Sequence, residues 1–298
     1  MKVIKDDQVV YALSPDNRPV LEVEPGEQVV FETKDCFSNQ IRTENDLFAS
    51  VGWATINPAT GPLAVKGARP GDVLAVDVVD IEVAEQGVMV AVPGLGALGH
   101  LIQDSETKIV PIRQGQAVFD DKVRLPVVPM IGVIGTAPEK EAVPCGTPGP
   151  HGGNMDTRHM GKGARLYLPV FVPGANLCLG DLHAVMGDGE VVVCGVEIPG
   201  RVTVRVDLFN GRQLSSPMLE TADAIYTIAS AADLDEAAQM ALENMLDFVR
   251  SRTGLSLNDA GMLLSIAAHL EISQVVDPLK TARMRLPKTV AAAYGIRF

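Results

Sequence analysis

The chain has 298 residues, of which 47% are hydrophobic and 21% are charged, a composition that can fill a substantial globular core. Its formal net charge of −12 argues against nucleic acid or an anionic membrane surface as the principal partner, because both polyanions attract a basic surface. Four cysteines without a Cys-x-x-Cys pair argue against a disulfide scaffold and a structural zinc ribbon.

The N-terminal residues carry no export signal, and no apolar run approaches the ~20 residues that span a bilayer. With unpaired cysteines as well, the cytoplasm is the expected location, and no membrane partner is expected.

Residues 1 to about 210 are predicted to form a β-rich part, because glycines and prolines divide them into short apolar runs. The clearest strand patterns cover 27–33, 73–79 and 200–211. A more continuously apolar run, 190–196, predicts a strand that is covered on both faces. Many short strands between such turns favour a sandwich or a barrel.

Helices are expected only near the C-terminus. Residues 233–254 predict one, with Asp233 as N-cap, Glu236 as its capping-box partner and Gly254 as the stop. A second begins at Ser256, and its apolar face is predicted to comprise Ala260, Leu263, Leu264, Ala267 and Leu270.

The predicted fold class is therefore mainly β, with sandwich- or barrel-like sheets of short strands and a smaller α-containing C-terminal part, α+β overall. We expect a β-rich core over residues 1–210 and an α/β part over 211–298 packed on it, or one continuous domain. The basic residues near the C-terminus are expected to be solvated, with docking on an acidic neighbouring subunit as the alternative; they are Lys280, Arg283, Arg285, Lys288 and Arg297.

The segment 151–156, HGGNMD, is the first candidate for chemistry. Gly152 and Gly153 would let the backbone approach a ligand, and Asn154 offers both a donor and an acceptor, the complement of a primary amide. A glycine turn with an Asx-type cap is the alternative interpretation.

The segment 181–190, DLHAVMGDGE, is the second candidate for chemistry. On an extended strand Asp181 and His183 point to the same face, where carboxylate and imidazole suit zinc or another divalent cation. Glu190 enters an apolar run that could raise its pKa into the range of a working base; a solvated strand end is the alternative. Asp188, between two glycines, is equally a turn residue.

A protein nucleophile is harder to find. No Gly-x-Ser-x-Gly elbow is present. Cys145 lies six residues before His151, but the context of a nitrilase-type cysteine is missing, and a buried hydrophobic role is the more common one for cysteine.

Three blocks, HGGNMD, YLPVFVPGANLCLGDLHAVMGDGE and CGVEI, together resemble the acetamidase/formamidase family. The likeness extends upstream to 57–83, 88–99 and 129–139, and downstream to 264–278, so it covers nearly the whole chain in order. It implies hydrolysis of short amides to carboxylate and ammonia, a mostly β fold, at least a homodimer and dependence on a divalent metal. Family motif positions fall on His151, Asn154, Asp156, Asp181, His183 and Glu190, and Asp35 lies where a short acid-containing motif is common. His269 departs from the acidic residue expected there.

These observations suggest a hypothesis in which Asp181 and His183, with His151 or Asp35, hold the metal. Zinc is the first candidate, with calcium or another divalent ion as the alternative. Glu190 would move the proton, while Asn154 and Asp156, with Gly152 and Gly153, would bind the carboxamide. Two rival readings are a non-catalytic protein that binds a metal or a small amide, and a hydrolase of a cyclic or amino-acid amide.

Overall fold

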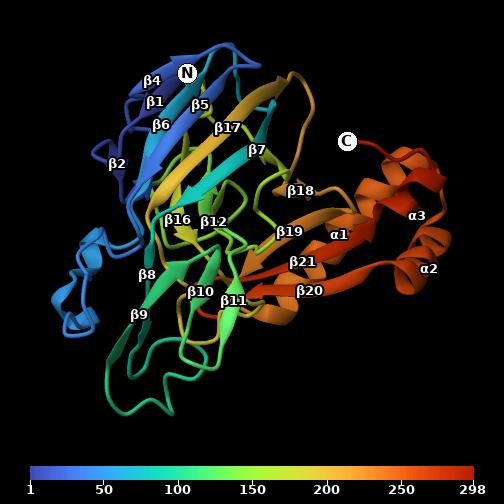
Figure 1. The fold of residues 1–298 in the computed structure, drawn as a ribbon. Coiled ribbons are helices and arrows are strands. Elements are labelled where there is room, and N and C mark those ends of the chain that lie inside the picture. Colours follow the sequence, from blue (N-terminus) through green and yellow to red (C-terminus); the bar gives the residue numbers. More distant parts are fainter.

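The computed structural model describes residues 1–298, and most of its elements are short strands in four sheets (Figure 1). The largest sheet has nine strands, in the order β1 (Lys2–Ile4), β5 (Gln28–Thr33), β17 (Gly200–Phe209), β7 (Val73–Val83), β15 (Arg165–Pro169), β18 (Met218–Glu220), β19 (Ala224–Ala231), β21 (Lys280–Pro287) and β20 (His269–Gln274). Most neighbouring strands in it run antiparallel, and only β1 and β5 pair in parallel.

The second sheet carries the candidate site. Its order is β14 (Gly152–Asn154), β12 (Met130–Gly135), β16 (Leu177–His183), β6 (Ala59–Val65) and β2 (Val9–Val10), with β4 (Leu21–Val23) also pairing with β6. A four-stranded sheet contains β11 (Arg124–Pro126), β10 (Gln116–Val118), β9 (Glu106–Arg113) and β8 (Gln86–Ala91), and β13 (Val143–Pro144) pairs with β3 (Ala12–Leu13). Two short 3-10 helices, Phe48–Ser50 and Trp53–Thr55, lie between β5 and β6.

The main core lies between the two large sheets. A cluster of 35 buried apolar residues draws Phe31 and Val204 from the nine-stranded sheet, and Ile131 and Leu179 from the six-stranded one. The strand predicted over 200–211 is confirmed as β17, whose three valines are fully buried while Leu208 packs against the same core. Two sheets packed over one core confirm the mainly β, α+β fold.

The helices α1 (Leu234–Thr253), α2 (Leu257–Ala267) and α3 (Lys288–Ala293) pack at one end of the nine-stranded sheet, beside β19 to β21 (Figure 1). The N-cap and the stop of α1 are as predicted: the Asp233 carboxylate accepts from two backbone N–H groups, and Gly254 ends the helix with φ 70°. The capping box is not formed, because no hydrogen bond joins the Asp233 N–H to the Glu236 side chain. Ser256 caps α2 by accepting from the Asp259 N–H. Leu270 does not belong to the α2 face, because residues 269–274 pair with β21 and leave this side chain 51% exposed.

The strand predicted at 190–196 is wrong. Glu190 and Val193 have φ of 50° and 100°, outside the β region, and the Val193 N–H donates to the Glu190 carbonyl to close a turn. The run is apolar because part of it, including Cys194, packs into a small cluster with Val88 and Val90. Tertiary contacts therefore explain its composition, whereas strand pairing does not.

Strands from both sides of residue 210 share the nine-stranded sheet, and the division at 210 stays a prediction. None of the helices combines the length and apolar composition that crossing a membrane requires. The prediction of a solvated basic C-terminus is wrong for Arg283, whose side chain is fully buried in β21.

Candidate active site

The site gathers around His183, the last residue of β16, which lies between β12 and β6 in the six-stranded sheet. Four buried carboxylates face its Nε2 atom: Glu197 Oε1 at 3.0 Å, Asp181 Oδ1 at 3.6 Å, Asp156 Oδ1 at 3.8 Å and Glu190 Oε1 at 3.8 Å. Asp181 and His183, two residues apart, lie together as expected, although Asp181 does not have the backbone of a regular strand.

Three of these acids lie on left-handed backbone. Asp156, Asp181 and Glu190 have φ of 42°, 55° and 50°. A β-carbon resists this region, and residues held there cluster at functional sites. Each carboxylate therefore leaves the chain in a direction that a regular strand would not give it.

Gly132 of β12 makes room for two of the carboxylates. A Cβ on this residue would overlap Oδ1 of Asp156 and would lie 2.6 Å from Oδ2 of Asp181. On the other side, Gly195 packs against the His183 ring, where a Cβ would lie 2.8 Å from Nδ1. The backbone N–H of Gly195 also donates to Glu197 Oε1 at 3.0 Å. These two glycines allow the close packing of the charged groups.

Burial and mutual repulsion raise the pKa of three acids of the cluster, Asp156, Glu190 and Glu197. Burial, followed by the charge of Asp181, raises the pKa of Asp156 from 3.8 to about 7. Burial also raises the pKa of Glu197 from 4.5 to about 8, and burial with the charge of Asp156 raises the pKa of Glu190 well above 4.5. Such a cluster near neutral pH either retains protons or binds a cation.

The negative charges of the same acids also shift the pKa of His183. Burial alone would lower its pKa, but the charges of Glu197 and Asp181 outweigh it and raise the pKa well above 6.5. The acids thus favour positive charge close to Nε2, where a metal cation would compete with the proton.

Several buried atoms here have no hydrogen-bond partner, which is unusual for buried polar groups. They include Asp156 Oδ1, His183 Nε2, Glu190 Oε2, Glu197 Oε2 and Asn154 Oδ1. The ligand atoms of Asp156, His183 and Glu190 lie within 4.8 Å of one another, and those of Cys36, Asp181 and Glu197 form a second such group. Oxygen and imidazole donors at this spacing fit a divalent cation.

Asn154 lies beside the cluster on β14, where its Nδ2 donates to Asp277 Oδ2 at 3.0 Å while its Oδ1 has no partner. Gly152 and Gly153 have φ of 97° and 80°. A Cβ on either would overlap a backbone carbonyl, of Ile134 or of Thr147. Close backbone packing is therefore enough to explain these two glycines, which form strand β14 together with Asn154.

Asp35 and His151 lie outside both groups of possible ligands. Oδ1 of Asp35 accepts from the backbone N–H groups of Phe37 and Asn39, at 3.0 and 2.7 Å, and so caps a turn. His151 is buried with Nε2 unpartnered, and burial lowers its pKa from 6.5 to about 4. Neither side chain forms an ion pair with His183, although burial and, to a smaller extent, the charge of Asp181 raise the pKa of Asp35.

Cys145 and His269 also lie apart from the cluster. Cys145 is buried, its thiol donates to the Val10 carbonyl at 3.5 Å, and burial raises its pKa to about 12. A catalytic cysteine needs the opposite shift, because the thiolate is the nucleophile. His269 is an exposed residue of β20, paired in register with Arg285.

Glu197 belongs to the CGVEI block but had no predicted role, and Cys36 and Asp277 were not among the predicted site residues. Glu197 makes the shortest of the four carboxylate contacts to His183 Nε2. Asp277 lies between β20 and β21, 123 residues from the Asn154 that it contacts. Acids inside apolar stretches were the available signal for Glu197, whereas Asp277 had none.

A family model described as the Acetamidase/Formamidase family matches residues 3–144 and 140–292. The chain belongs to this family. A crystal structure of an acetamidase from Bacillus halodurans is 49% identical with a TM-score of 0.97, and the match covers 99% of this chain and 100% of that one.

Two more distant family comparisons matter for function. A formamidase of Methylophilus methylotrophus is 27% identical over 68% of this chain, and the match spans 65% of that protein's length. A gamma lactamase structure from Delftia acidovorans is 25% identical with a TM-score of 0.68, covering 96% of this chain and 90% of that one.

Proposed function

We propose that this acetamidase/formamidase family member hydrolyses short aliphatic amides, with formamide and acetamide as the first candidates, to carboxylate and ammonia. The observation that carries the proposal is the convergence of four buried carboxylates on His183 Nε2. The names of the acetamidase and formamidase relatives support the substrate class.

We assign the cation site to His183, Asp156 and Asp181, the imidazole with two of the carboxylates that face it at 3.8 and 3.6 Å. A bound divalent cation supplies Lewis acidity, which strengthens water as a nucleophile and polarises an amide carbonyl. Zinc suits the mixed nitrogen and oxygen donors, and calcium would favour an all-oxygen set.

Glu190 is our candidate for moving the proton. Its Oε2 has no hydrogen-bond partner, and burial raises its pKa. A carboxyl of raised pKa can take a proton from the attacking water and deliver it to the departing amide nitrogen near neutral pH.

Asn154 is our candidate for orienting the substrate. Its Nδ2 is held by Asp277, so the unpartnered Oδ1 has a fixed direction and can accept from the NH₂ group of a carboxamide. Asp156 would orient the same carboxamide through the cation site.

We further propose that the protein works as a homo-oligomer of at least two subunits in the cytoplasm. The oligomer follows from the family resemblance. The four free cysteines fit a reducing compartment.

Ammonia release from formamide, acetamide and propionamide by the purified protein with Zn²⁺ tests the proposal. We expect turnover of at least one of the three. The gamma lactamase relative makes cyclic amides the second candidate, so γ-butyrolactam is included and its ring opening is followed as a new primary amine. Ring opening without ammonia release would favour the second candidate, and no turnover of any substrate would favour a binding protein.

A further inference from the structure

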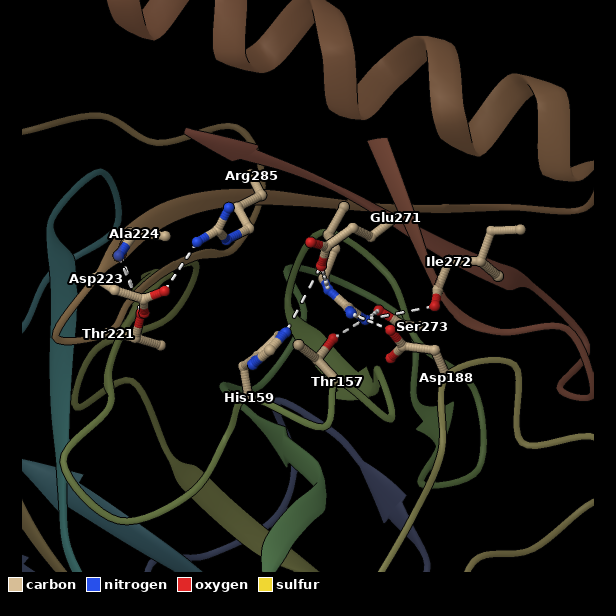
Figure 2. Close-up of polar contacts among 11 residues, drawn as sticks. Thr157, His159, Asp188, Thr221, Asp223, Ala224, Glu271, Ile272, Ser273 and Arg285 are labelled. Atoms are coloured by element: carbon tan, nitrogen blue, oxygen red, sulfur yellow. Dashed lines mark hydrogen bonds and ion pairs between the residues drawn. The ribbon is translucent and has the colours of Figure 1, made fainter. Parts of the chain in front are cut away.

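Arg283 is a charged side chain that the proposed mechanism does not use. It lies in β21, is 0% exposed, and its guanidinium contacts two neighbouring segments, β20 and the turn that carries Asp188. Nε donates to Glu271 Oε2 at 2.8 Å, Nη1 to Ser273 Oγ at 3.0 Å, and Nη2 to Asp188 Oδ2 at 2.7 Å. Figure 2 shows Glu271, Ser273 and Asp188 converging on one point.

The contact to Asp188 fixes the segment that carries Glu190. Asp188 lies two residues before Glu190, and between them Gly189 pairs with the end of β20: its N–H donates to the Ser273 carbonyl at 2.9 Å. A second backbone bond runs from the Val275 N–H to the Gly189 carbonyl at 3.3 Å, so one guanidinium bond and two backbone bonds hold this segment against the β20–β21 hairpin.

Ser273 connects the same hairpin to a second part of the site. Its hydroxyl lies 3.0 Å from that of Thr157, the residue that follows Asp156. Arg283 is therefore linked to the segment of Glu190 through Asp188, and to the segment of Asp156 through Ser273 and Thr157. It contacts neither Glu190 nor Asp156 itself.

Charge compensation alone does not require the Asp188 contact. Glu271 is the cross-strand partner of Arg283 and already places one carboxylate on the buried guanidinium. A buried guanidinium needs at least one carboxylate partner. The second carboxylate, from the distant Asp188, in addition fixes the position of the segment that carries it relative to Arg283.

We propose that Arg283 is a positioning residue, which acts through Asp188 to hold the Glu190 carboxyl in place. The inference rests on the proposed function, because it assigns Glu190 the proton-moving role. Losing the Asp188 contact leaves only the two Gly189 backbone bonds to hold the segment against the hairpin. A displacement of about 1 Å at a reacting group can cost about 100-fold in rate.

The test is a double-mutant cycle on kcat for acetamide, or for whichever substrate wild type turns over. Asp188→Asn alone is expected to lower kcat about 10- to 100-fold with a melting temperature close to wild type. In a Glu190→Gln background the same change is expected to cost less than about threefold, because residues that act as a unit are not additive.

Arg283→Lys is the second variant. Lysine keeps the positive charge but lacks the planar fork of donors that reaches three acceptors. We therefore expect a kcat between those of wild type and Asp188→Asn. Asp223→Asn is the matched control. Asp223 is exposed and pairs at 2.8 Å with Arg285, which lies in β21 like Arg283. The kcat of this variant should stay within about twofold of wild type. Both ion pairs can be followed in Figure 2.

Equal losses from Asp188→Asn in the wild-type and Glu190→Gln backgrounds would overturn the positioning role, since they would indicate a general structural effect. So would wild-type kcat in Asp188→Asn. A wild-type protein that turns over no amide would instead overturn the proposed function, and the inference with it.

Discussion

Glu190→Gln is expected to lower kcat for the preferred amide by about 10² to 10⁴, the usual cost of losing a general acid–base group. Glutamine has nearly the same shape, so the packing around this buried side chain should persist, but its carboxamide cannot take up the proton. Zn²⁺ binding should remain close to wild type, because our cation site consists of His183, Asp156 and Asp181. Ammonia release and equilibrium dialysis with Zn²⁺ measure the two quantities separately.

Glu220→Gln is the matched control. This glutamate is also partly buried, but its carboxylate pairs with Tyr167 and Lys288. It should keep turnover within about twofold, as expected for an ion pair outside the site. If Glu190→Gln stays within about tenfold of wild type, the proton-moving role is wrong. If it instead loses Zn²⁺ together with activity, Glu190 is a metal ligand.

Gly132→Ala is expected to lower kcat/KM by about 100-fold, because a small misplacement of reacting groups has effects of this size. The new methyl group would overlap Asp156 Oδ1 and lie 2.6 Å from Asp181 Oδ2, so both carboxylates must move. They belong to the cation site, and Zn²⁺ affinity should fall together with turnover. Steady-state kinetics and dialysis on the same preparation test this.

Gly261→Ala provides the control for adding a methyl group. A Cβ at Gly261 in α2 meets nothing within 4 Å, so activity should not change and helix stability should rise by about 0.5–1 kcal/mol. Wild-type kinetics and Zn²⁺ affinity in Gly132→Ala would show that the two carboxylates do not work where the structure places them.

The parts of the site that depend on local geometry could be predicted from the sequence. Asp181 and His183 lie together as their two-residue spacing predicted, although the positive φ of Asp181 departs from a regular strand. The predicted cap, Asp233, begins α1 at Leu234. Glu190 was also a candidate from its own segment, and the resemblance to the family, confirmed by the family model, added Asp156. Glu197, the fourth acid that faces His183, was given no role.

The remaining site residues depend on contacts between distant segments. Asp277 reaches Asn154 across 123 positions, and Arg283 reaches Asp188 across 95, and no local pattern marks such pairs. The run after Glu190 misled for a related reason. Its apolar side chains predicted a strand, but two residues with positive φ turn the chain, and the apolar groups pack into a separate cluster.

The most direct measurement is ammonia release by wild type before and after chelator treatment, followed by separate add-back of Zn²⁺ and Ca²⁺, with His183→Ala in parallel. We predict that chelation abolishes turnover, that one cation restores it in wild type, and that neither restores it in His183→Ala. Turnover that persists in the thoroughly chelated protein, or that returns in His183→Ala with added cation, would contradict a metal-dependent site at His183.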